Sequence, residues 1–211
     1  MGANLMSLAR SGGKFLKLFG DRKMMKLLPY DAEVEYLEST GTQFIDTLIS
    51  PDASTIWRLT CAATNESLAF IGAIDVSAIR FHFSLYDAGV VRGCMGKIQS
   101  IIGSPDLAFH VLELDAVNKR TGMDGVYVPC AYHEIPYLPI WLFGRNSDNY
   151  TFRRMVSVKT SASQIWKSGV LVCDHIPVRV GDVGYMYDRV SGQLFGNAGT
   201  GAFVIGPDKT I

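Results

Sequence analysis

The chain has 211 residues, of which 48% are hydrophobic, 19% charged and 11% aromatic. This composition excludes a largely disordered chain, because such chains lack the apolar side chains whose burial offsets the entropy lost on ordering. Twenty Lys and Arg residues balance twenty Asp and Glu residues, so no overall field directs the protein toward nucleic acid or an anionic membrane. The length predicts one principal domain.

Residues 1–28 form a basic arm with a net charge of +5, which leaves −5 on the rest of the chain. Gly20 and Asp21 favour the end of one helix and the start of the next, and Pro29 disfavours helix at Leu28. We therefore expect two short amphipathic helices, which need another surface to pack against. The side chains that we expect to anchor the arm are Phe15, Leu16, Leu18, Phe19, Met24, Met25, Leu27 and Leu28.

Three roles compete for this arm: docking onto protein, lying on a membrane, and binding nucleic acid. A nucleic-acid arm needs few large apolar residues, and Gly12, Gly13 and Gly20 interrupt the continuous apolar face that membrane binding rewards. We therefore expect the arm to dock onto protein. No apolar run approaches the roughly 18 residues of a membrane span, and the start has no signal-peptide pattern, so we expect neither a span nor export.

After Pro29 the sequence is typical of a β-sandwich, with short β-branched and aromatic runs between Gly, Asn, Asp and Pro. Residues 79–86 alternate most clearly: Ile79, Phe81 and Phe83 are expected in the core, and the residues between them in solvent. Asp124-Gly125 predicts a hairpin turn. Further strands are predicted at 55–63, 68–73, 89–94, 107–115, 125–130, 139–144, 154–160, 164–167, 170–175, 184–188 and 202–205.

The metal-binding residue types show no metal-binding spacing. The cysteines are more than thirty residues apart and form no CxxC pair, so we expect buried, reduced thiols at Cys61, Cys94, Cys130 and Cys173. The histidines, which lack an HxxxH pair, are His82, His110, His133 and His175. The aspartates that border predicted turns leave calcium open without forming a motif; they are Asp75, Asp87, Asp148 and Asp188. We assign no metal ligand and predict no cofactor.

Three segments, Val34–Thr47, Phe109–Gly125 and Gly169–Pro207, resemble a known domain. It is the concanavalin A-like, laminin-G-like jelly roll found in phage structural proteins and in surface proteins of gut bacteria. The resemblance covers about residues 30–207. It implies an all-β fold, a two-sheet antiparallel jelly-roll sandwich, which we assign to residues 29–211. The short helical N-terminal arm of residues 1–28, expected from its own sequence, precedes it.

Paired carboxylates are the chemistry by which enzymes on this fold cut glycans. The family's glucanases carry them in an E-x-D-x-x-E pattern on one strand, which we do not find. The nearest cluster, Glu33, Glu35 and Glu38, lies in an edge segment where acidic residues favour solubility. Ser77 and Ser84 lack the GxSxG context of a nucleophile. We therefore predict no enzymatic activity and no catalytic residues.

Sugar binding needs an aromatic ring beside hydrogen-bonding side chains. The segment 145–150, after the strand predicted at 139–144, has that composition, and residues 86–87 at another strand end are a second candidate. An ordinary solvated loop is the alternative for both. The candidate carbohydrate-binding residues are Tyr86, Asp87, Arg145, Asn146, Asp148, Asn149 and Tyr150. Three tryptophans are instead expected in the core, namely Trp57, Trp141 and Trp166.

The resemblance and the basic arm together predict a non-enzymatic structural or adhesion protein of a phage virion, of the head, tail-fibre or decoration type. Residues 1–28 would attach it to other virion proteins, and we expect a homo-oligomer. The displayed sandwich would be lectin-like, with host or mucosal glycans as candidate ligands. The missing signal peptide fits assembly in the host cytoplasm. The alternative is a carbohydrate-binding, lectin-like surface protein of a gut bacterium.

Overall fold

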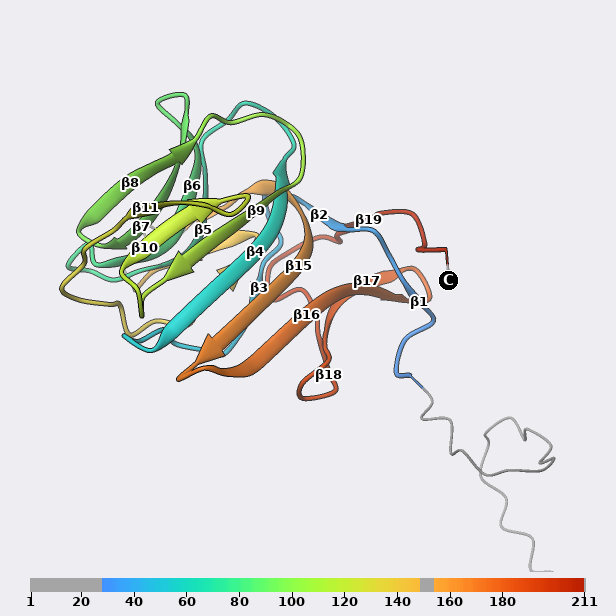
Figure 1. Ribbon diagram of the computed structural model, residues 1–211. Helices are drawn as coiled ribbons and strands as arrows, with labels where there is room; N and C mark the ends of the chain where they lie inside the picture. Colours follow the sequence, from blue (N-terminus) through green and yellow to red (C-terminus); the bar gives the residue numbers. More distant parts are fainter. Residues whose placement is uncertain (1–27, 149–153, 211) are drawn as a thin grey trace, which may run out of the picture.

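The structure is a computed structural model, and it describes residues 28–148 and 154–210. Within these ranges every regular element is a β-strand, and the strands form two sheets that pack as a sandwich (Figure 1). The all-β sandwich predicted from the sequence is therefore confirmed. The arm helices and all of the anchoring residues before Leu28 lie outside the described ranges. No helix within those ranges is long and apolar enough to cross a bilayer.

The larger sheet has eleven strands and a continuous path of eight. Along that path lie β11 (Val126–Pro129), β10 (Arg120–Met123), β9 (His110–Asp115), β4 (Thr55–Ala63), β15 (Ser157–Lys167), β16 (Val170–Val180), β17 (Val183–Asp188) and β18 (Gln193–Phe195). Three short strands complete it: β1 (Ala32–Glu33) pairs with β16, β2 (Leu37–Thr40) pairs with β15, and β19 (Val204–Ile205) pairs with β2.

The smaller sheet has eight strands and a path of six. That path contains β14 (Arg154–Met155), β13 (Gly144–Asn146), β5 (Ala69–Ile74), β6 (Arg80–Asp87), β7 (Val90–Gly96) and β8 (Ile98–Gly103). Beside it, β12 (Trp141–Leu142) pairs with β5 and with β3 (Ile45–Asp46). Among the described strands, all pairs are antiparallel except β13 with β5.

The core lies between the sheets and is built by alternation along the strands. Trp57 of β4 is fully buried, and its ring centroid lies 5.1 Å from that of Phe83 on β6. Phe81 and Leu85 face the same way as Phe83 and are also buried, as the alternation predicts. The four cysteines are buried and none is in a disulfide, so the prediction of buried thiols is confirmed.

Two predictions of side-chain environment are wrong. His82 and Ser84 were expected in solvent, but they are 1% and 0% exposed. Phe70 covers the same outer face of the smaller sheet, with its ring centroid 5.4 Å from that of His82. Trp57 and Trp141 are buried as expected, whereas Trp166 is only half-buried. Trp166 lies one position along β15 from fully buried Ile165, so alternation turns its ring away from the core.

The strand boundaries differ from the prediction in several places; the strand predicted at 139–144, for instance, is divided between β12 and β13. Asp124 and Gly125 do form a hairpin turn with positive φ angles of 52° and 81°, but it joins β10 to β11, because residues 120–123 form a strand of their own. Strand β8 was not predicted. The strands predicted at 154–160 and 164–167 are short β14 and continuous β15, which a bulge between Thr160 and Ala162 interrupts without ending it.

Candidate functional site

The predicted pair Tyr86 and Asp87 is divided between two sides of the smaller sheet. The pairing of β6 with β7 shifts register between Ser84 and Asp87, and Tyr86 has a φ of 55°. Tyr86 packs against the core. Asp87 accepts hydrogen bonds from Nε of Arg92 at 3.1 Å and from the Ser84 hydroxyl at 3.4 Å. The structure therefore does not bring the two side chains together on one face.

The second predicted cluster lies partly in a strand. Arg145 and Asn146 belong to β13, and each is 6% exposed. The Arg145 guanidinium lies 4.0 Å from the centre of the Phe70 ring, and the Asn146 amide donates to the Pro139 carbonyl at 2.9 Å. Asp148 is exposed and accepts a hydrogen bond from the Tyr137 hydroxyl. Asn149 and Tyr150 lie outside the described residues.

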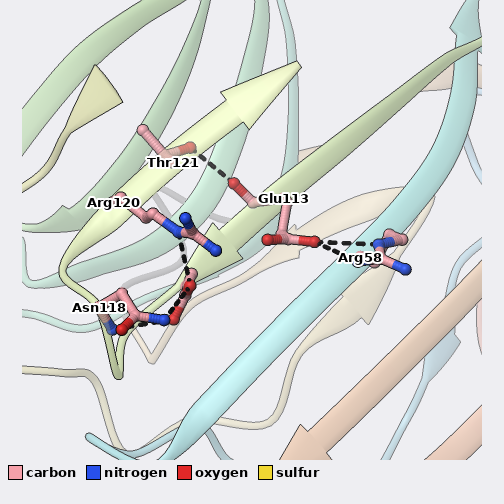
Figure 2. Close-up of polar contacts among 6 residues, drawn as sticks. Arg58, Glu113, Asn118, Arg120 and Thr121 are labelled. Carbon is pink, nitrogen blue, oxygen red and sulfur yellow. Dashed lines mark hydrogen bonds and ion pairs between the residues drawn. The ribbon is translucent and has the colours of Figure 1, made fainter. Parts of the chain in front are cut away.

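A different set of polar and aromatic side chains lies on the outer face of the larger sheet. Figure 2 shows three of its polar members, Arg58, Glu113 and Arg120. Arg58 alternates with fully buried Trp57 and Leu59, and Glu113 alternates with buried Leu112 and Leu114, so both point away from the core. The strand register aligns five residues across β11, β10, β9, β4 and β15, in the order Tyr127, Gly122, Glu113, Arg58 and Gln164.

The next row on this face contains Arg120, Asp115 and Trp166. Arg120 is opposite Asp115, which is opposite Ile56, which in turn is opposite Trp166. We call the two rows together the outer-face site, and its polar and aromatic members are Arg58, Glu113, Asp115, Arg120, Tyr127, Gln164 and Trp166.

Two buried carboxylates fix two exposed arginines in the outer-face site. The Glu113 side chain is 6% exposed and accepts hydrogen bonds from Nε and Nη2 of Arg58 at 3.0 and 2.7 Å (Figure 2). The Asp115 side chain is 1% exposed and accepts from Nε of Arg120 and from the Asn118 amide, each at 2.8 Å. The arginine side chains remain 44% and 42% exposed, so their other N–H donors face solvent in a fixed orientation.

Each arginine also lies against an aromatic ring. The Arg58 guanidinium carbon is 5.3 Å from the Trp166 ring centre, and that of Arg120 is 4.1 Å from the Tyr127 ring centre. Gly122 leaves room for the tyrosine ring, because a Cβ there would lie 2.7 Å from Cδ1 of Tyr127. Burial, followed by a hydrogen bond with Glu113, raises the pKa of Tyr127. Rings and hydrogen-bond donors are therefore combined on one face.

The same face holds a carboxylate pair that the sequence analysis did not assign. Glu113 and Asp115 are two residues apart on β9 and match the first two positions of the E-x-D-x-x-E pattern. Asn118 stands at the third position and donates its side-chain amide to Asp115. An amide cannot exchange a proton as a general acid must, and each carboxylate is already occupied by an arginine. The third carboxylate of the glucanase pattern is therefore replaced by an amide in this chain.

A smaller feature lies at one end of the sandwich, around His110. Its Nδ1 is 2.6 Å from Asp124 and its Nε2 is 2.8 Å from Asp106. The adjoining apolar pocket, lined in part by Tyr86 and Met123, encloses about 10 Å³, the space of one water molecule. No group of three or more His, Cys, Asp and Glu side chains within residues 28–148 and 154–210 could hold a metal ion.

The outer-face site could not be found from the sequence alone, because the sequence does not specify the register between β4 and β9. Alternation around Arg58 and Glu113 indicates that both face away from the core, but the two are 55 residues apart in the chain.

Comparisons with protein-family models, with curated proteins and with solved structures found no match to this chain. Its function is therefore inferred from the site's own residues and from the sequence resemblance.

Proposed function

We propose that this chain is a non-enzymatic adhesion protein of a phage particle. Its sandwich binds glycans on the outer-face site, and residues 1–28 attach it to other virion proteins. The observation that carries glycan binding is the pairing of exposed, oriented arginines with partly exposed rings on one sheet face, Arg58 with Trp166 and Arg120 with Tyr127.

This combination matches the chemistry of a sugar. The apolar side of a pyranose ring stacks on an aromatic face, while its hydroxyl oxygens accept hydrogen bonds from N–H donors. Arg58 and Arg120 are held in place by buried carboxylates, so little of their conformational entropy remains to be lost on binding. The replacement of the last glutamate of the catalytic pattern by Asn118 supports a role without catalysis.

The resemblance supports the virion setting and a finer description of the fold. We propose that the sandwich is a concanavalin A-like jelly roll and that residues 1–28 form amphipathic helices. The three segments that carry the resemblance include strands β2 and β3, β9 and β10, and β16 to β19. A lectin-like surface protein of a gut bacterium is the competing assignment.

Glycan-array binding by the intact protein tests the adhesion role. We expect Trp166→Ala to weaken binding at least tenfold, about 1.4 kcal/mol, with circular dichroism unchanged because the ring lies outside the core. Arg179→Ala is the matched control: it removes a partly exposed ion pair with Asp208 away from the site. Loss of binding in Arg145→Ala but not in Trp166→Ala would place the glycan on the smaller sheet instead.

Deletion of residues 1–28 tests the virion role. We expect the truncated protein to keep the β-type circular dichroism of the sandwich and to be absent from purified particles. Normal incorporation of the truncated form would assign attachment to the sandwich. Recovery of the intact protein from a bacterial envelope, and not from particles, would favour the bacterial surface protein.

A further inference from the structure

Charge balance within the outer-face site indicates the class of glycan that it binds; this inference rests on the proposed function. Three exposed arginines on the face are each matched by a carboxylate that is largely buried behind them, and Lys159 on the same face pairs with the partly exposed Glu38 at 3.8 Å. The arginine pairs are Arg58 with Glu113 at 2.7 Å, Arg120 with Asp115 at 2.8 Å, and Arg189 with Asp174 at 2.7 Å. The face therefore presents hydrogen-bond donors without net positive charge.

The row that contains Arg58 and Gln164 extends to Asp174 on β16, and its charges are also paired there. Gln164 donates to Asp174 at 3.1 Å and lies between that residue and Arg58 in the register. On one side, Thr60 lies opposite Val111 and adds no charge, and on the other side uncharged Ile56 lies between Asp115 and Trp166 in the row of Arg120. No unbalanced cation among these residues attracts an acidic ligand.

A carboxylate or sulfate on the ligand gains little attraction from an arginine whose charge Glu113 or Asp115 already balances, and drawing that arginine away would break the ion pair. Loss of that arginine would leave a carboxylate uncompensated at 6% or 1% exposure, which is strongly unfavourable. A neutral hydroxyl imposes no such cost, because it accepts from the arginine N–H groups that the buried carboxylates leave free.

The site is also elongated. Tyr127 and Gln164 lie at opposite ends of a straight row with four strand spacings between them, roughly 19 Å. We infer that the ligand is a neutral, linear oligosaccharide several sugars long, lying across β11, β10, β9, β4 and β15, and that uronic-acid, sialylated and sulfated glycans are bound less well.

The test uses the full chain on an array that carries linear neutral gluco-, manno- and galacto-oligosaccharides beside uronate, sialylated and sulfated oligosaccharides. We expect neutral oligosaccharides to bind, with affinity changing less than about twofold between about 50 and 500 mM NaCl. Glu113→Gln keeps the side-chain shape and leaves Arg58 unbalanced, so acidic glycans should gain at least tenfold and become salt-sensitive. Glu33→Gln, in an exposed pair with Lys209, is the control that should change nothing.

The possible results of this experiment distinguish the proposed glycan binding from the inferred preference for neutral glycans. Folded wild-type protein that binds no glycan contradicts the proposed function and this inference together. Salt-sensitive binding of acidic glycans by wild-type protein, abolished by Trp166→Ala, leaves the proposed function standing and overturns the inference. If Glu113→Gln does not fold, Asp115→Asn makes the equivalent change beside Arg120, and unchanged selectivity in a folded variant also overturns it.

Discussion

The two ring nitrogens of His110 form hydrogen bonds with two carboxylates, those of Asp124 and Asp106. Burial lowers the pKa of His110, but hydrogen bonds and charges from Asp124 and Asp106 outweigh that effect and raise the pKa above the ordinary 6.5. The hydrogen bond with His110 lowers the pKa of Asp106. The pKa of Asp124 is also lowered: burial raises it, but the Val111 backbone N–H and His110 outweigh burial. The bridge ties the loop before β9 to the turn between β10 and β11.

We predict that this bridge stabilises the fold most between the ordinary pKa values of aspartate and histidine. Because the folded pKa of His110 is raised, the contribution is complete below pH 6.5 and is lost as pH rises through the folded value. It is also lost as pH falls through the lowered aspartate pKa values. His110→Gln should cost about 1 kcal/mol or less near pH 6 and nearly nothing near pH 9. Thermal unfolding at both pH values checks this, and equal losses would contradict it.

Gly72 combines close packing with a positive φ angle. Its φ is 131°, and a Cβ there would lie 2.3 Å from the carbonyl oxygen of Phe81 on the neighbouring strand. Gly89 has a φ of 75° but no atom within 4 Å of the equivalent Cβ position. Substitution by alanine at the two positions therefore distinguishes the cost of steric overlap from the cost of backbone strain alone.

We predict that Gly72→Ala destabilises the protein by at least about 2 kcal/mol, since β5 and β6 must move apart. Gly89→Ala, the control, should cost about 1 kcal/mol from the left-handed conformation. Urea unfolding measures both free energies. Indistinguishable losses would show that β5 accommodates the methyl group without displacing β6.

Strands β4 and β15 are joined in the core by a side-chain hydrogen bond as well as by their backbone hydrogen bonds. The indole Nε1 of Trp57 donates to the Ser163 hydroxyl at 3.0 Å, and both residues are fully buried. A polar contact in such surroundings fixes the position of the large ring between the sheets.

We predict that Ser163→Ala costs about 1–3 kcal/mol, because it leaves the buried indole N–H without its acceptor. Trp57→Phe should also destabilise, and the double variant should lose less than the sum of the two. A double-mutant cycle by chemical unfolding measures this coupling. Additive losses would indicate that the hydrogen bond contributes nothing.

The sequence is informative about elements whose signal is local. Alternation identifies β6, and Asp124-Gly125 identifies the turn before β11, because both depend on residues close in the chain. The sequence of β10, RTGM, combines one β-branched residue with a glycine, so it favours a connection over a strand. The outer-face site depends on register between strands that are far apart in sequence, which no local pattern specifies. The burial of Arg145 in β13 likewise depends on its pairing with β5.

The two sheets of the sandwich differ in which side chains their outer faces expose. The smaller sheet has His82, Ser84 and Arg145 buried on or beside its outer face, whereas the larger sheet exposes parts of Arg58, Arg120 and Tyr127. The described chain begins beside β16, where the Asp31 backbone N–H donates to the Arg179 carbonyl at 2.9 Å (Figure 1). If the protein is attached to a particle through residues 1–28, as we propose, the β11 edge of the larger sheet is the edge farther from the attachment point.

We propose that the outer face of the larger sheet binds a glycan, and a ¹H–¹⁵N NMR titration of the intact protein locates the bound glycan residue by residue. With a neutral oligosaccharide that binds on the array, we expect saturable shifts at the Trp166 indole, the Arg58 and Arg120 side chains, and the backbone of β4, β9 and β15. Shifts confined to residues around Arg145, Tyr137 and Asp148, or no shifts at saturating oligosaccharide, would contradict the claim.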